Sequence, residues 1–315
     1  MNTFRKILVG MDLSDTDYAL LTYARFMGER FPIEKAYFFH VSPGLEVPNG
    51  NENFYKEMEI PSIPPDEQIR VRMESEVGRK IKPGLFDTEF DVVEGSVTRQ
   101  LLHWSEIKKV DMVILGKKFS NESSGISARR FLRNAPCSVL FVPEKVKTTV
   151  RKLLVTTDFS MDSTLALKQA IDFASTFDPA PEIQLLNIYQ VPDGVHYQIG
   201  RTYAHFAQMI RDNIRDYMQK YLMQIEHKGI RIEPIMIQNN YMNIARHIYE
   251  FASSQQSDML LIGAKGHSAL TSFLVGSVTE KTLAYDFDIP IWVIRPLSGF
   301  ATEKPDTEEK FQKTI

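Results

Sequence analysis

The chain contains one internal duplication, and this feature limits its fold more than any other. Four pairs of landmarks recur in the same order at nearly constant separations. The separations are 146 residues for Asp12 and Asp158, 147 for Gly116 and Gly263, 151 for Gly125 and Gly276, and 154 for Pro136 and Pro290. A separation of about 150 residues has the size of a domain and far exceeds the repeat of a solenoid. The sequence therefore predicts two copies of one domain.

The segments outside the two copies differ from them in composition. Residues 144–151 are mostly polar and are interpreted as a linker, while residues 297–315 are charged and interrupted by Pro and Gly, which is typical of a flexible tail. The two predicted domains are therefore residues 1–143 and residues 152–296.

Each copy alternates short apolar segments with amphipathic helical segments. The apolar segments predicted as strands are residues 6–11, 36–41, 88–93, 112–115 and 138–142 in the first copy, and 153–155, 183–189, 232–237, 258–262 and 290–294 in the second. Uninterrupted apolar runs joined by helices are typical of parallel strands buried on both faces. With right-handed crossovers, the predicted fold class is α/β, with a doubly wound parallel sheet in each domain.

A glycine-rich segment follows the fourth predicted strand of the second copy. It begins Gly263-Ala-Lys-Gly266 and continues, nine residues later, with Gly276-Ser277. Backbone N–H groups can approach an anion closely at glycine, and a helix beginning near Ser277 would add the positive end of its dipole. The pattern indicates a phosphate cradle, although glycines after a strand also serve as plain turn residues. Asp158, after the first strand of that copy, would face the same crevice if the first and fourth strands are neighbours.

Together these residues resemble the universal stress protein family in its tandem two-domain form, over about residues 1–296. The resemblance rests on Val9-Gly-Met-Asp12 and Val155-Thr-Thr-Asp158, on the glycine segment, and on the loop-Pro-strand segments around Pro136 and Pro290. The family implies a five-stranded parallel sheet of order 3-2-1-4-5 in each domain, of the adenine-nucleotide-binding type. Members with the full glycine loop bind ATP, and degenerate members do not.

For the second domain, the resemblance implies one bound ATP or related adenine nucleotide, with Mg²⁺ as an accompanying ion. The residues that match the adenine, ribose and phosphate positions of the family are Thr156, Asp158, Ile188, Ile262, Gly263, Gly266, Gly276, Ser277 and Val278. Lys265 and His267 lie inside the loop, where each could add charge beside the phosphates or be a solvated loop residue.

The first domain departs from the family pattern. Gly116 is kept, but Phe119 stands where the second glycine belongs, only five residues separate Phe119 from Gly125, and Ile126 replaces the serine. A short loop with a bulky phenylalanine is not expected to wrap a triphosphate. The first domain is therefore predicted to be empty or to hold a ligand other than ATP, and Asp12 is interpreted as a turn or helix-capping residue.

The leading hypothesis is a stress-response or regulatory protein that binds ATP in its second domain. No general base is identifiable beside the loop, so the protein is not expected to be an enzyme, beyond a weak ATPase activity. Two alternatives stay open. One is an interaction or small apolar-ligand carrier protein that uses the helices at 66–82 and 202–228, and the other is an ATP-dependent enzyme, since the fold class also hosts adenylating enzymes. The two domains are expected to pair through their last strands as a pseudo-dimer, with a homodimer and unidentified protein partners left open.

Composition limits the partners and the compartment. The formal net charge is −3, which excludes the strongly basic surface of a general nucleic-acid binder. No apolar run approaches the ~18 residues of a membrane span, and no metal-ligand spacing or Walker A loop is present. The N-terminus lacks the features of a signal peptide. The single cysteine, Cys137, cannot form an intramolecular disulfide, so a reducing, cytoplasmic location is expected.

Overall fold

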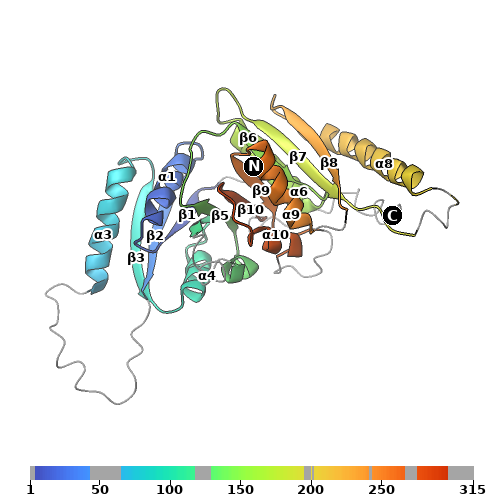
Figure 1. The fold of residues 1–315 in the computed structure, drawn as a ribbon. Coiled ribbons are helices and arrows are strands. Elements are labelled where there is room, and N and C mark those ends of the chain that lie inside the picture. Colours follow the sequence, from blue (N-terminus) through green and yellow to red (C-terminus); the bar gives the residue numbers. More distant parts are fainter. Residues whose placement is uncertain are drawn as a thin grey trace, which may run out of the picture.

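The structure is a computed structural model of the whole chain (Figure 1). It describes residues 4–42, 65–117, 129–194, 200, 202–240, 243–266 and 275–296. The predicted tail at 297–315 lies outside the described residues.

The strands form at the predicted apolar segments, with boundaries that differ by one or two residues. In the first copy they are β1 (Lys6–Met11), β2 (Lys35–Ser42), β3 (Asp87–Glu94), β4 (Met112–Lys117) and β5 (Ser138–Pro143). In the second copy they are β6 (Lys152–Thr156), β7 (Glu182–Tyr189), β8 (Ile232–Gln238), β9 (Met259–Gly263) and β10 (Ile291–Ile294). In the first copy, the described helices with both ends defined are α1 (Thr16–Gly28), α3 (Pro65–Lys80) and α4 (Val97–Ile107), and residues 129–134 are also helical. Those of the second are α6 (Met161–Ala174), α8 (Tyr203–Met223), α9 (Ile244–Gln255) and α10 (Ser277–Thr282).

All ten strands belong to one continuous sheet with the order β3-β2-β1-β4-β5-β10-β9-β6-β7-β8. Each copy contributes a half with the order 3-2-1-4-5, which confirms the predicted fold class, and the strands within each half pair in parallel. The halves meet where β5 and β10 pair antiparallel. The expected pairing of the last strands is therefore present, and it fuses the two sheets into one.

Side chains alternate between the two faces of the sheet, and each face has its own apolar core. On β1, Ile7 and Val9 belong to one core and Leu8 to the other. The first core is covered by α1, α3, α6 and α8, and the second by α4, α9 and the helical residues 129–134. Helices on both faces explain why the central strands are apolar along their whole length.

The junction between the halves is packed with aromatic rings. Trp292 on β10 is fully buried, and its ring lies 5.2 Å from Phe4, 5.8 Å from Phe31 and 5.8 Å from Phe173, measured between centroids. Arg295, just after β10, donates from Nη2 to the carbonyl of Leu132 in the first half at 2.9 Å. The two copies therefore share one core.

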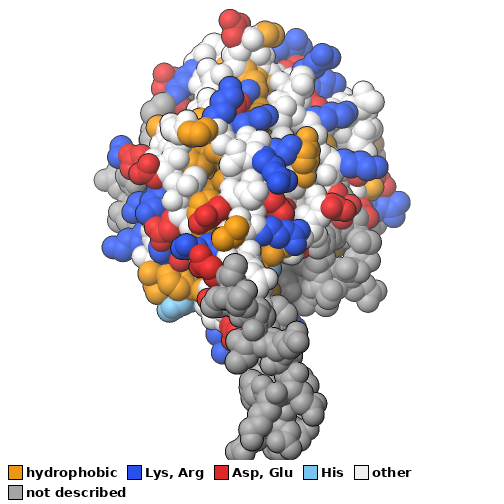
Figure 2. Space-filling view, turned by 90° about the vertical axis from the view of Figure 1, so that its left-hand side faces the viewer, with side chains coloured by type: hydrophobic (Ala, Val, Ile, Leu, Met, Phe, Trp, Pro, Cys, Tyr) orange, Lys and Arg blue, Asp and Glu red, His pale blue; other side chains and the backbone are white. Residues whose placement is uncertain are grey.

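The outer surface carries both signs of charge. On the face shown in Figure 2, basic and acidic side chains are interspersed. On α3, for example, Arg72 pairs with Glu76 at 2.9 Å and Arg70 with Glu67 at 3.2 Å. Among the helices that the structure describes, none is both long and apolar enough to cross a membrane.

Candidate functional site

Each half of the sheet has a cavity where its strand order reverses. The first lies beyond the carboxyl ends of β1 and β4 and measures about 240 Å³, and the second lies beyond β6 and β9 and measures about 320 Å³. Crevices at such reversals are the usual ligand sites of doubly wound sheets.

The turn after β6 forms one wall of the second cavity. Asp158 accepts a hydrogen bond from the N–H of Ser160 at Oδ1 (3.1 Å), and Phe159 between them has a positive φ of 64°. The hydroxyl of Ser160 then caps α6 by accepting from the N–H of Ser163 at 3.3 Å. Asn187 on β7 donates to the carbonyl of Thr157 at 2.8 Å. These bonds fix the position of Asp158 at the cavity.

Asp162, in the first turn of α6, ties the glycine segment to this wall. Its Oδ2 accepts the N–H of Lys265 at 3.0 Å, although the two residues are 103 positions apart. Burial raises the pKa of the Asp162 carboxyl, and the charge and N–H of Lys265 act in the opposite direction. The sequence analysis missed Asp162, because its only local signal is that of an acidic residue at a helix start.

Two of the three glycines lie in close contact with the turn after β6 and the start of α6, Gly263 against backbone and Gly266 against a side chain. A Cβ on Gly263 would lie 2.7 Å from the backbone carbon of Asp162, so this glycine lets α6 approach β9. A Cβ on Gly266 would lie 2.3 Å from Oδ2 of Asp158, so this glycine lets the loop lie against the carboxylate. At Gly276 the nearest atoms would be 3.5 Å away, which is ordinary contact. The glycine spacing therefore reflects close packing at Gly263 and Gly266.

The chain returns to the cavity at α10. The N–H of Gly276 donates to Ala264 at 2.8 Å, and the hydroxyl of Thr279 donates to the carbonyl of Gly263 at 2.8 Å. The expected helix does begin at Ser277, but it has only six residues. A helix of that length adds little to the dipole argument for phosphate binding.

The structure brings the predicted site residues together around the second cavity, with one exception. The predicted residues that line it are Thr156, Asp158, Ile188, Ile262, Gly263, Lys265, Gly266, Gly276, Ser277 and Val278. His267 lies outside the described residues. Lining residues that the sequence analysis did not assign to the site are Thr157, Ser163, Leu186, Ile244, Ile248 and Thr279. Ile244 and Ile248 stood out in the sequence only as the apolar face of a helix.

Lys265 is the one cation among the described residues that line the second cavity. Desolvation lowers the pKa of its ammonium, while Asp162 nearby favours the charged form. The second cavity therefore combines an apolar wall, a carboxylate and a cation.

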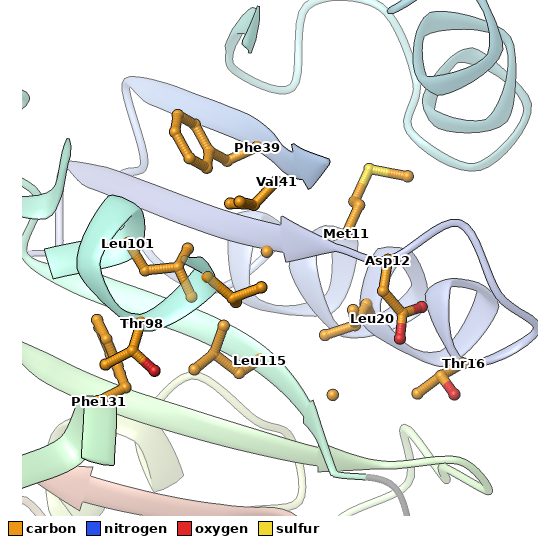
Figure 3. A pocket seen from close by; sticks show the side chains of 13 residues that line it. Met11, Asp12, Thr16, Leu20, Phe39, Val41, Thr98, Leu101, Leu115 and Phe131 are labelled. Carbon is orange, nitrogen blue, oxygen red and sulfur yellow. The ribbon is translucent and has the colours of Figure 1, made fainter. Parts of the chain in front are cut away.

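The first cavity repeats the turn but differs in its polar residues, which are Asp12, Thr16 and Thr98 among the described lining (Figure 3). Asp12 accepts the N–H of Ser14 at Oδ1 (3.1 Å), and Leu13 between them has a φ of 60°. This confirms the interpretation of Asp12 as a turn residue. The equivalents of Thr156 and Thr157 are Gly10 and Met11, so two hydroxyls are lost. The shortened loop with Phe119, Gly125 and Ile126 lies outside the described residues.

The fold and the two cavities define a tandem, doubly wound α/β protein with one cavity at the strand-order reversal of each half. Comparison with known families gives the more specific assignment. Residues 3–143 and residues 149–295 each match the universal stress protein family. The chain therefore belongs to the universal stress protein family and carries two of its domains.

Individual relatives agree with this assignment. Universal stress protein MJ0531 of Methanocaldococcus jannaschii is 25% identical over 145 residues, which cover 46% of this chain and 82% of that protein. A universal stress protein of Archaeoglobus fulgidus DSM 4304 is 15% identical, with a TM-score of 0.64 over 95% of this chain and 99% of that one. The functionally unknown protein PA1789 of Pseudomonas aeruginosa PAO1 is 14% identical, with a TM-score of 0.58 over 94% of each chain. The two structures support the tandem fold.

Proposed function

We propose that this protein is a regulatory nucleotide-binding protein that holds one ATP, or a related adenine nucleotide, in the second cavity. The observation that carries the proposal is the packing of Gly266 against the Asp158 carboxylate, with Lys265 beside it. This arrangement places an acceptor for ribose or adenine donors close to a cation that suits phosphate oxygens.

The rest of the cavity suits the base. Ile188 and Ile248 provide apolar surface on β7 and α9, as an adenine ring requires. A volume of about 320 Å³ falls at the lower end of the range of about 300–1,000 Å³ found for small-molecule sites. A nucleotide would then have its base inside and its phosphates toward Lys265.

Binding without efficient catalysis is the second part of the proposal. The carboxylate of Asp162 is buried and accepts the N–H of Lys265, so it is poorly placed to activate water. In the part of the chain that the structure describes, no group of three or more His, Cys, Asp or Glu could hold a metal ion. Mg²⁺ usually keeps several waters and binds substrate phosphates, so we propose that an accompanying Mg²⁺ is held chiefly by the nucleotide.

Calorimetric titration with ATP and with adenosine tests the proposed site. The intact protein should bind one ATP per chain. Ile244→Trp, which fills the second cavity at the start of α9, should weaken ATP binding more than tenfold. Val97→Trp is the matched control, because Val97 lines the first cavity at the start of α4. It should leave ATP affinity within twofold.

The phosphate end is tested by Lys265→Ala. This change should weaken ATP at least fivefold and leave adenosine unchanged, since adenosine carries no phosphate. Absence of ATP binding by the intact protein, or equal losses in Ile244→Trp and Val97→Trp, would refute the site. Two ATP per chain would refute its restriction to the second half. Sustained phosphate release well above background would favour the enzyme hypothesis instead.

A further inference from the structure

We propose that Arg295 is a positioning residue for the phosphate end of the second cavity: it offsets the charge of Asp162, so that Lys265 retains its attraction for phosphate. Arg295 is not among the described residues that line this cavity, and it acts through these two neighbours. The inference rests on the nucleotide site proposed above. It adds to that site a residue that the first half of the chain holds in place.

The side chain of Arg295 is anchored at the junction of the two halves. The residue is 7% exposed, and its Nη2 donates to the carbonyl of Leu132 at 2.9 Å. The backbone N–H of Arg295 donates to the hydroxyl of Ser138 at 3.1 Å. Both partners belong to the first half, Leu132 in the helical residues 129–134 and Ser138 on β5. The first half therefore determines where this guanidinium group lies.

Arg295 also lies beside the glycine segment, because β10 pairs with β9. Ile294 is paired with Gly263, and the carbonyl of Ile294 accepts the N–H of Ala264 at 2.9 Å. Arg295 follows Ile294 in the chain, and Lys265 follows Ala264. The two cations therefore leave the sheet next to each other.

The carboxylate of Asp162 interacts with both of these cations. Burial raises the pKa of the Asp162 carboxyl, while Lys265 and Arg295 act in the opposite direction. Burial lowers the pKa of the Arg295 guanidinium, and the charge of Asp162 opposes that change. The backbone N–H of Lys265 donates to Oδ2 of Asp162 at 3.0 Å, which holds the carboxylate against the glycine segment. One buried carboxylate thus has two cationic neighbours.

A single negative charge cannot cancel two positive charges. Without Arg295, the carboxylate of Asp162 would be balanced against Lys265, and the positive potential at the phosphate end would fall. The sign of this change does not depend on other charges nearby, because exactly one positive charge is removed. Salt screens such partly buried groups less than it screens charges at the surface. The attraction for phosphate is therefore expected to depend on Arg295.

Calorimetric titration of the full chain with adenosine, AMP and ATP tests this role. Arg295→Met removes the charge, so it should weaken ATP binding at least fivefold and AMP binding less, and it should leave adenosine within twofold. The loss should grow with the number of phosphates, because adenosine carries no charge for the potential to act on. Arg295→Lys keeps the positive charge and should leave ATP affinity within threefold.

Ser138→Ala is the matched control for damage to the junction. It removes the hydroxyl that accepts the N–H of Arg295 but keeps the guanidinium charge. The affinity for ATP should therefore stay within twofold of that of the intact protein. An effect as large as that of Arg295→Met would show that junction packing, and not charge, controls the site.

The charge balance itself is tested by rescue. Asp162→Asn keeps an acceptor for the N–H of Lys265 but removes the negative charge, so it should strengthen ATP binding at least threefold. Added to Arg295→Met, it should return ATP affinity to within threefold of the intact protein, which a purely structural role of Arg295 would not allow. Asp162→Asn retains Arg295, so it also tests the balance if Arg295→Met does not fold.

Four outcomes would overturn the proposal. They are an ATP affinity within twofold in Arg295→Met, equal losses for adenosine and ATP in that variant, an equally large loss in Ser138→Ala, and weaker ATP binding or no rescue with Asp162→Asn. Absence of ATP binding by the intact protein is a different failure, since it would refute the nucleotide site itself and this inference with it.

Discussion

At the scale of single residues, Asp12 and Asp158 form the same hydrogen-bonded turn, although the cavities that they line have different residues around them. Both accept an N–H two residues ahead and close the same turn, at 3.1 Å in each copy. The aspartate after the first strand is therefore explained by the fold, and by itself it does not indicate a nucleotide. In the second copy Lys265 and Gly266 line the cavity beside the carboxylate, whereas the equivalent positions of the first copy, Lys118 and Phe119, lie outside the described residues.

Gly266→Ala tests whether the close contact between the glycine loop and Asp158 is needed for ATP binding. The new Cβ would lie 2.3 Å from Oδ2 of Asp158, so either the carboxylate or the loop must shift from its position at the cavity. We expect ATP affinity to fall at least tenfold in calorimetry. Gly276→Ala is the control, since its Cβ would make only ordinary contacts at 3.5 Å, and its affinity should stay within threefold. Equal effects of the two changes would contradict this account.

Asp17 should make stability depend on pH in a predictable direction. Burial raises its pKa from 3.8 to about 6, and the side chain is 1% exposed. A raised folded-state pKa contributes stability that is complete below about pH 4 and is lost as the pH rises through 6. The loss amounts to about 3 kcal/mol at most.

Urea unfolding of the intact protein and of Asp17→Asn at several pH values measures this contribution. The free energy of unfolding of the intact protein minus that of the variant should decrease between pH 4 and pH 7.5. Asp15→Asn, an exposed change in the same turn, controls for the loss of a charge. A difference that rises with pH would show that the two backbone N–H groups outweigh the cost of burial.

At the scale of elements, β5 and β10 show how an edge strand becomes a central one. Each would be the edge of its own half-sheet, yet every residue of β5 and β10 is buried. Their antiparallel pairing supplies hydrogen-bond partners for backbone groups that an edge would leave open. The apolar faces of both strands then extend the two cores across the junction.

Trp292→Ala should be among the most destabilising single changes in this chain. Its ring is fully buried and contacts rings from both halves, so truncation leaves a large cavity at the junction. We expect a loss of about 3–5 kcal/mol in the free energy of unfolding. Trp104→Ala is the comparison, because Trp104 is only partly buried at the edge of the other core, and it should cost less. A smaller loss at Trp292 than at Trp104 would contradict the shared core.

At the scale of the whole molecule, one sheet and a shared junction predict cooperative unfolding of the two halves. The two tryptophans offer one probe on each side, since Trp104 packs on Phe39 of the first half and Trp292 lies on β10 of the second. In the single-tryptophan variants Trp104→Phe and Trp292→Phe, fluorescence should follow coincident urea transitions after correction for the stability of each variant. Far-UV circular dichroism provides the control. Transitions separated by more than about 0.5 M urea would show two independent domains.

Much of this architecture is encoded locally. The ten strands lie at the predicted apolar segments, and the order 3-2-1-4-5 appears in each half. Apolar runs and helical periods are properties of short segments, so the sequence reveals them directly. The duplication made them easier to recognise, because each segment is seen twice. The gathering of Asp158, Gly263, Gly266 and Gly276 at one cavity followed from the same strand order.

The contacts that depend on distant residues could not be predicted. Asp162 reaches Lys265 across 103 positions, and Gly263 is small because α6 passes close to β9. Asp17 lies in the first turn of α1, but its carboxylate turns back to accept the N–H groups of Asp12 and Leu13.

By itself, the sequence determined a duplicated α/β protein with one intact and one altered glycine loop. Only the tertiary structure decided that the two halves share a single ten-stranded sheet, and that the altered half keeps a cavity beyond the carboxyl ends of β1 and β4. The physical reason is that local periodicity records which face of a segment is buried. It does not record which distant side chain covers that face.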